Sequence, residues 1–109
     1  MKYMTLREVC IDAEVSRRAV QGYEKAGLVS ATRKSERGYL LYDANSQERI
    51  KKIRLFQELG FSIKEIKGII DAPKDDLKSA LEERIKKLKE EKAHKERLIS
   101  KAYEFIEQL

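Results

Sequence analysis

Residues 15–28, VSRRAVQGYEKAGL, decide the fold because they predict a short helix with a clear beginning and a clear end. Ser16 has the hydroxyl side chain that caps the free amides at a helix N-terminus. Gly27 suits the left-handed position that often follows the last turn of a helix. The sequence therefore predicts a helix from Arg17 to about Ala26, which opens with two consecutive arginines.

A second short helix is predicted immediately before this one. Thr5 and Glu8 have the spacing of a capping box, and apolar residues recur at helical spacing from Leu6 to Asp12. Cys10 lies on that apolar stripe, where we expect a small core residue; a redox or metal-binding role is the alternative. Two short helices joined by three or four residues are typical of a helix-turn-helix, whose second helix enters the major groove of DNA.

The pattern changes from helix to hairpin over residues 29–42. Apolar residues flank the segment RKSERG at residues 33–38, which carries three cations and a turn glycine. Such a stretch predicts a β-hairpin. A hairpin directly after a helix-turn-helix is a wing, and a basic wing can rest on the phosphates beside the groove.

Two more helices are predicted after the hairpin. Asp43 is the N-cap of a third helix that ends at Gly60. Ser62 and Glu65 form a second capping box, which opens a short fourth helix. This helix ends before Pro73, because the residue before a proline avoids the α region. The apolar stripe expected to face the core from the third helix consists of Ile50, Ile53, Leu55, Phe56 and Leu59.

One long helix is predicted from Asp75 or Asp76 to Leu109, with a length of roughly 50 Å. Its apolar positions recur about every 3.5 residues, and Lys92 and Lys95 interrupt them. A lone helix must bury such a stripe somewhere, and a second chain is the simplest partner; the alternative is a helix that folds back on its own head. The positions expected at the dimer interface are Leu81, Ile85, Leu88, Ile99, Ala102, Ile106 and Leu109.

The composition bounds the class of protein. A chain of 109 residues suffices for one compact core. Residues 1–71 carry 14 basic and 10 acidic side chains, whereas residues 72–109 carry 10 and 9, so the positive charge belongs to the N-terminal part and favours a polyanion partner. No apolar run approaches the roughly 20 residues that span a bilayer, and no apolar signal core follows Met1. We therefore expect a soluble, cytoplasmic protein that binds no membrane.

A catalytic function is not expected. The chain has one histidine, one cysteine and no glycine-rich phosphate loop, so it offers neither a nucleophile–base pair nor a metal site. We expect a mainly α protein that needs no cofactor. Residues 1–72 form a winged helix-turn-helix DNA-binding domain with a small β-hairpin wing, and residues 73–109 form a long dimerisation helix.

A set of short motifs links these elements to a known family. The motifs are Val15-Ser16, Arg18, Tyr23-Glu24, Gly27-Leu28, Gly38-Tyr39, Tyr42, the segment 58–62 and Glu65-Ile66. With the order of elements over residues 3–72, they resemble the MerR family of bacterial transcription regulators. The resemblance implies a homodimer, joined by an antiparallel coiled coil of the long helices, on a palindromic promoter element with an overlong spacer. Family members bend and untwist this DNA, usually when an effector binds, which realigns the hexamers recognised by RNA polymerase.

The resemblance also implies roles for individual residues. The start of the second helix contacts bases and phosphates, Tyr23 lies near the DNA backbone, and the wing and a second wing at Lys64 contact the flanks. The residues assigned to DNA are Ser16, Arg17, Arg18, Tyr23, Arg33, Lys34, Arg37, Tyr39, Tyr42 and Lys64. The alternatives are core or half-buried tyrosines, an ordinary solvated helix face for the two consecutive arginines, and a plain surface charge for Lys64.

Three positions depart from the family pattern. The family commonly has Arg-Tyr-Tyr where this chain has Gln21-Gly22-Tyr23, and an arginine after the wing Gly-Tyr where this chain has Leu40. Gly22 also costs about 1 kcal/mol inside a helix relative to alanine. These departures favour weaker DNA binding or weaker duplex distortion than the family norm. The alternative function is a protein-interaction or architectural module, either excisionase-like or an anti-regulator.

The effector stays unassigned. Metal-sensing relatives carry cysteines at the far end of the dimer helix and drug-sensing relatives carry a separate domain, and this sequence has neither. We expect the apolar end formed by Tyr103, Phe105, Ile106 and Leu109 to seal the dimer. A small apolar effector pocket, a lost downstream domain and regulation without a ligand are the alternatives.

Overall fold

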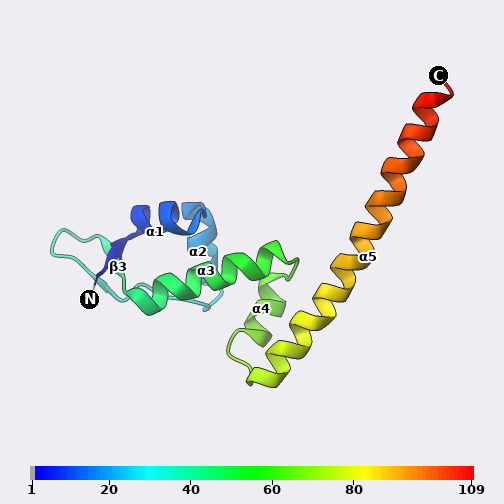
Figure 1. Ribbon diagram of the computed structural model, residues 1–109. Helices are drawn as coiled ribbons and strands as arrows, with labels where there is room; N and C mark the ends of the chain where they lie inside the picture. The colour runs from blue at the N-terminus through cyan, green and yellow to red at the C-terminus, as the bar shows by residue number, and fades with distance from the viewer. Residues whose placement is uncertain (1) are drawn as a thin grey trace. The chain divides into compact units, whose positions relative to one another are not determined.

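The computed structural model describes residues 2–109 and is mainly helical, as predicted (Figure 1). The chain divides into two compact units, a head that ends at Asp71 and a second unit from Ala72 to Leu109. The elements of the head are β1 (Met4–Thr5), α1 (Leu6–Ala13), α2 (Arg17–Lys25), β2 (Arg33–Lys34), β3 (Leu40–Tyr42), α3 (Ala44–Glu58) and α4 (Ile63–Ile69). The second unit consists of α5 (Lys74–Glu107), which begins slightly earlier than predicted.

The predicted helix starts are confirmed by their hydrogen bonds. Thr5 and Glu8 form the capping box of α1, and Ser62 and Glu65 form that of α4. Ser16 Oγ accepts a hydrogen bond from the backbone amide of α2 at a distance of 3.0 Å. The Asp43 carboxylate accepts the corresponding bond in α3 at 2.9 Å. Gly27, with a φ of +78°, has the left-handed backbone predicted for the end of α2.

The wing belongs to a three-stranded antiparallel sheet, in the order β1-β3-β2. Met4 pairs with Tyr42 and Arg33 pairs with Leu41. The hairpin strands are shorter than the predicted span. Strand β1 was not predicted, because a strand of two residues carries no alternating pattern. The pairing with β1 ties the wing to the segment that enters α1.

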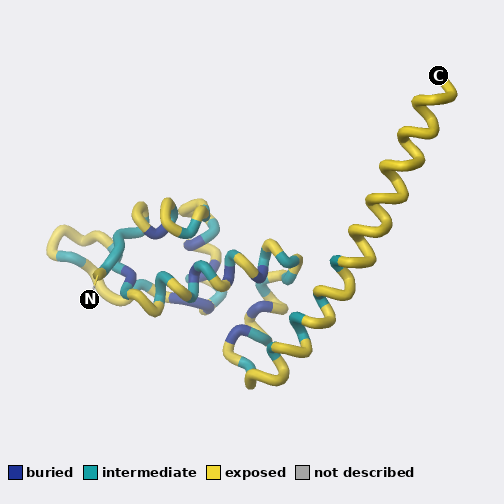
Figure 2. Tube along the Cα trace, viewed as in Figure 1, coloured by how far each residue is buried: buried dark blue, intermediate teal, exposed yellow. Residues whose placement is uncertain are grey.

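The core of the head lies between its helices and β3, where the trace is coloured as buried in Figure 2. Ile50, Ile53 and Phe56 of α3 point into it, as predicted. Leu55 was wrongly placed in this stripe and is 52% exposed. Its position one residue before Phe56 turns it about 100° away from the buried face of the helix.

The long helix α5 has no buried residue. All residues from 91 to 109 are exposed, which Figure 2 shows as a continuous exposed stretch. The exposed large apolar side chains of α5 are Ile85, Leu98, Ile99, Tyr103, Phe105 and Ile106, and Leu109 follows the helix. By itself this unit therefore offers apolar surface that it does not bury.

Candidate nucleic-acid interface

The first turn of α2 presents two arginines to solvent. Ser16 is exposed, but its hydroxyl is engaged in capping the helix. Arg17 and Arg18 follow it, and both are exposed. Within residues 2–109 neither arginine has an ion-pair partner. These two guanidinium groups are therefore available to an external anion.

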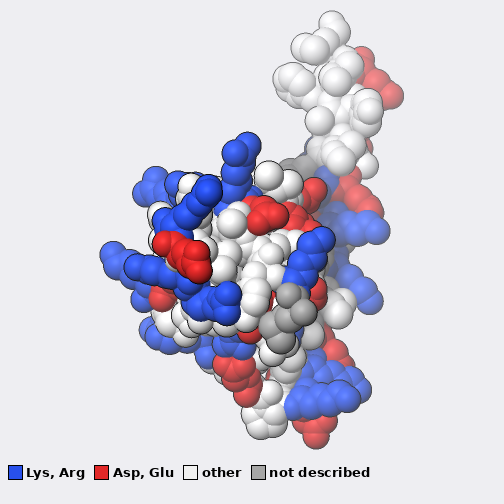
Figure 3. All heavy atoms as spheres, turned by 90° about the vertical axis from the view of Figure 1, so that its left-hand side faces the viewer, with Lys and Arg blue, Asp and Glu red and all other residues white. Residues whose placement is uncertain are grey.

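The wing adds three exposed cations. Arg33 and Lys34 lie on β2, and Arg37 lies in the turn before Gly38. The Arg33 guanidinium lies 4.8 Å from the centre of the Tyr3 ring, which holds it beside the N-terminal segment. Lys and Arg side chains project around the face of the molecule that carries the wing (Figure 3).

Tyr39 and Lys64 are placed where DNA could reach them. Tyr39 follows the wing turn and is 60% exposed, so its ring is a surface feature and not part of the core. Lys64 lies in the first turn of α4 and is exposed. Both positions are compatible with the predicted contacts.

Tyr23 and Tyr42 correct the sequence prediction. Their exposed fractions are 1% and 0%, so these side chains belong to the core, the alternative left open for them. The Tyr23 hydroxyl donates a hydrogen bond to Gln57 at 2.5 Å, and the Tyr42 hydroxyl donates one to Glu24. Burial raises the pKa of both phenols. A ring enclosed in this way positions the surface above it and cannot stack or bond directly with DNA.

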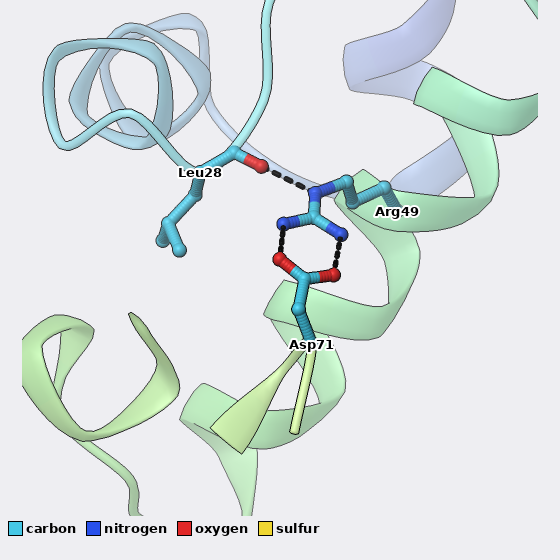
Figure 4. Close-up of polar contacts among 3 residues, drawn as sticks. All are labelled: Leu28, Arg49 and Asp71. Atoms are coloured by element: carbon cyan, nitrogen blue, oxygen red, sulfur yellow. Dashed lines mark hydrogen bonds and ion pairs between the residues drawn. The ribbon is translucent and has the colours of Figure 1, made fainter. Parts of the chain in front are cut away.

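Arg49 of α3 is a cation whose partners lie within the head. Its guanidinium donates two hydrogen bonds of 2.7 Å to the Asp71 carboxylate and a third to the carbonyl of Leu28 (Figure 4). The paired guanidinium lowers the pKa of Asp71. This contact joins the loop after α2 to the end of the head, so Arg49 is not a free DNA ligand.

Two further α3 cations are also paired. Lys51 lies 2.9 Å from the Asp12 carboxylate, and Arg54 donates a hydrogen bond to the Glu14 carbonyl at 3.1 Å. Glu14 ends α1 with a left-handed φ of 55°, so Arg54 braces the turn of the helix-turn-helix. The sequence gives no sign of these pairings, because the partners are far apart along the chain.

The structure adds one cation that sequence reasoning missed. Arg7, in the first turn of α1, lines the same hollow as Arg17 of α2 and Tyr39 of the wing. The hollow has a volume of about 490 Å³. No motif pointed to Arg7, because only the tertiary fold brings these three elements together.

Comparison with known proteins identifies the head. Residues 4–73 match the family of MerR helix-turn-helix regulatory proteins, and residues 47–101 match the MerR DNA-binding region. The chain belongs to the MerR family. The two matches describe a regulatory helix-turn-helix and a DNA-binding region.

Individual MerR relatives support the same assignment. The chain is 32% identical over 99 residues to the transcriptional activator mta of Bacillus subtilis, covering 91% of this chain and 38% of that protein. It is 33% identical over 60 residues to the mercuric resistance operon regulatory protein of Bacillus cereus, covering 52% of this chain and 46% of that protein. The chain thus spans less than half of the length of these relatives.

Solved structures in the MerR family have the same fold. MtaN, the N-terminus of the Bacillus subtilis multidrug transporter activator, superposes with a TM-score of 0.73 at 28% identity, covering 94% of this chain and 97% of that one. HiNmlR, a MerR regulator lacking the sensor domain and bound to promoter DNA, superposes with a TM-score of 0.75 at 20% identity, covering 91% and 80%. At that lower identity the second likeness shows the fold alone.

Membrane spans and metal sites are two other features that the described residues could form. Over residues 2–109, no helix is long and apolar enough to cross a membrane. Over the same residues, no three His, Cys, Asp or Glu side chains are grouped so that they could hold a metal ion. Cys10 is half-buried, and burial raises the pKa of its thiol.

Proposed function

We propose that this chain is a cytoplasmic transcription regulator that binds a palindromic promoter element as a homodimer. The observation that carries the proposal is the set of exposed cations on α2 and the wing of a head that matches the MerR family. In the proposed complex with DNA, α2 enters the major groove, where Arg17 and Arg18 contact bases and phosphates. The wing cations Arg33, Lys34 and Arg37 neutralise phosphates beside the groove.

A second copy of the chain is the proposed cover for α5. A helix of 34 residues is about 51 Å long at 1.5 Å per residue, and an isolated helix depends on packing for most of its stability. Two such helices in an antiparallel coiled coil would bury each other's apolar stripes. The proposed interface consists of Leu81, Ile85, Leu88, Ile99, Ala102, Ile106 and Leu109.

The proposed output is deformation of the bound duplex. A dimer that grips both half-sites can bend or untwist the DNA between them, and the energy of this deformation depends on the sequence of the spacer. The exposed Gln21 and Gly22 of α2 offer fewer contacts than two larger cationic or aromatic side chains would. We therefore expect weaker binding than in relatives that carry Arg-Tyr at these positions.

Selection of bound duplexes from a random pool, at moderate salt, tests this function. The expected result is a palindrome whose half-sites are about one helical turn apart, roughly 34 Å. Chemical footprinting of the selected duplex should show hypersensitive central bases if the protein deforms it. Recovery of no sequence above background from a folded dimer would contradict the proposal and favour a protein-interaction module.

A further inference from the structure

A hollow between α1, α2 and the wing is lined, among the residues that the structure describes, by two cations and no acidic side chain. Arg7 of α1 and Arg17 of α2 line it from the helices, whereas the wing lines it with the uncharged Gly38, Tyr39 and Leu40. Among residues 2–109, the two guanidinium groups are therefore the only charged groups that line it. Both arginines are exposed, and within residues 2–109 neither has an ion-pair partner. The Glu8 carboxylate next to Arg7 is engaged with the Thr5 amide at 3.0 Å.

Arg7 has no evident role in stabilising the head. It lies in the first turn of α1, where the helix dipole disfavours a cation. Its neighbour Glu8 already supplies the favourable charge and the capping bond at this end of the helix. A cation at an unfavourable position, without an ion-pair partner among residues 2–109, is available to a partner outside the chain.

We propose that Arg7 is a DNA-binding residue, which contacts a backbone phosphate in this hollow together with Arg17. The inference rests on the proposed function, because it assumes that α2 enters the major groove and that the wing contacts the phosphates beside it. A phosphodiester beside the groove entered by α2 would meet Arg17 from that helix and Arg7 from α1. Guanidinium groups suit this ligand because their donors match two phosphate oxygens.

The test is the salt dependence of binding to a duplex that the wild-type chain selects from a random pool. Arg7→Ala should weaken binding by about tenfold or more, because a hydrogen bond to a charged group is lost in each subunit. The slope of log affinity against log salt should fall by about 0.9 per contact, or about 1.8 for a dimer. Lys52→Ala is the control, since Lys52 is an exposed cation of α3 that lines no part of the hollow.

A charge-transfer variant makes the test specific to the hollow. In the double variant Arg7→Leu/Leu40→Arg, the cation moves from α1 to the wing but still lines the same hollow. Because Leu40→Arg by itself adds the arginine that the family commonly carries at this position, the single variant Leu40→Arg is measured as well. We expect Leu40→Arg to raise the affinity and the salt slope more in the Arg7→Leu variant than in the wild type, since in the wild type Arg7 already contacts the phosphate. An equal gain from Leu40→Arg in the two backgrounds would overturn the assignment of this hollow as the phosphate site, because the two arginines would then act independently.

Failure of the proposed function and failure of the Arg7 assignment give different results in these experiments. A wild-type chain that binds no duplex would overturn the proposed function, and this inference with it. A wild-type chain that binds, with an Arg7→Ala variant of unchanged affinity and slope, would overturn the inference alone. The thermal midpoint of the head, followed by circular dichroism, should not fall in Arg7→Ala, whereas a structural role for Arg7 would lower it.

Discussion

The head buries many of its apolar side chains, whereas the long helix α5 leaves its apolar side chains unburied. Every buried hydrophobic residue among residues 2–109 belongs to the head, and α5 has none. Ile53 of α3 has an exposed fraction of 0%, whereas Ile99 of α5 is 57% exposed. Burial of apolar surface is the main favourable term in folding. The head can therefore fold on its own contacts, while α5 requires a surface that a single copy of this unit does not provide.

The largest effect is expected from truncating the core of the head. Ile53→Ala should lower the free energy of unfolding by about 2–5 kcal/mol, because it leaves a cavity among packed side chains. Leu55→Ala, two residues along the same helix and 52% exposed, should change it by about 0.5 kcal/mol or less. Urea unfolding followed by circular dichroism measures both. Equal losses would contradict the placement of the core.

A smaller effect is expected from the polar contact at the end of the head. Arg49→Leu removes the bonds to Asp71 and to the Leu28 carbonyl, and should lower the free energy of unfolding by about 1–2 kcal/mol. Asp71→Asn should have less effect, since the Asp71 side chain is 71% exposed and solvent screens the ion pair. Chemical denaturation of both variants tests this order, and the reverse order would show that the Leu28 bond contributes nothing.

Gly22→Ala should stabilise the head by up to about 1 kcal/mol. A methyl group at this helical position meets no atom within 4 Å, so no strain offsets the gain in helix propensity. The thermal midpoint of the variant should rise. A fall would mean that α2 needs the flexibility of glycine at this point.

The last effect is a change in how stability depends on pH in the alkaline range, and it concerns the buried Tyr42. The folded state raises the pKa of Tyr42 above its ordinary value of 10.0, chiefly through burial. The neutral form is therefore favoured by folding, and the free energy of unfolding should decline as the pH rises beyond about 10. Tyr42→Phe should make this decline shallower, because it removes the phenol that ionises. An identical pH profile for wild type and Tyr42→Phe would contradict the buried phenol.

Features that depend on residues close together in the sequence were predicted correctly, whereas features that depend on distant residues were not. The helix starts at Thr5, Ser16 and Ser62 were predictable because each cap joins residues three positions apart. The two-residue strand β1 was not predicted, because it is defined by its pairing with β3 and not by a local sequence pattern. Local pattern therefore determined the elements and their order.

The candidate site was predictable only in part. The arginines of α2 and the cations of the wing follow from the local pattern of a helix-turn-helix and a basic hairpin. The hydrogen bond of Tyr23 joins it to Gln57, which lies 34 positions away, and the ion pair of Arg49 joins it to Asp71, 22 positions away. Arg7 joins the site only because the fold brings α1 beside the wing. Which cations are free is thus a property of the tertiary structure.

We propose that a second copy of the chain covers α5, and sedimentation equilibrium of wild type and Ile99→Asp measures whether it does. Lys101→Asp is the matched control, because position 101 lies about 200° around the helix from position 99. We predict a dimeric mass for wild type and Lys101→Asp. For Ile99→Asp we predict a monomeric mass with the unfolding transition of the head intact. A monomeric wild-type chain, or an Ile99→Asp variant that remains a dimer, would contradict the account.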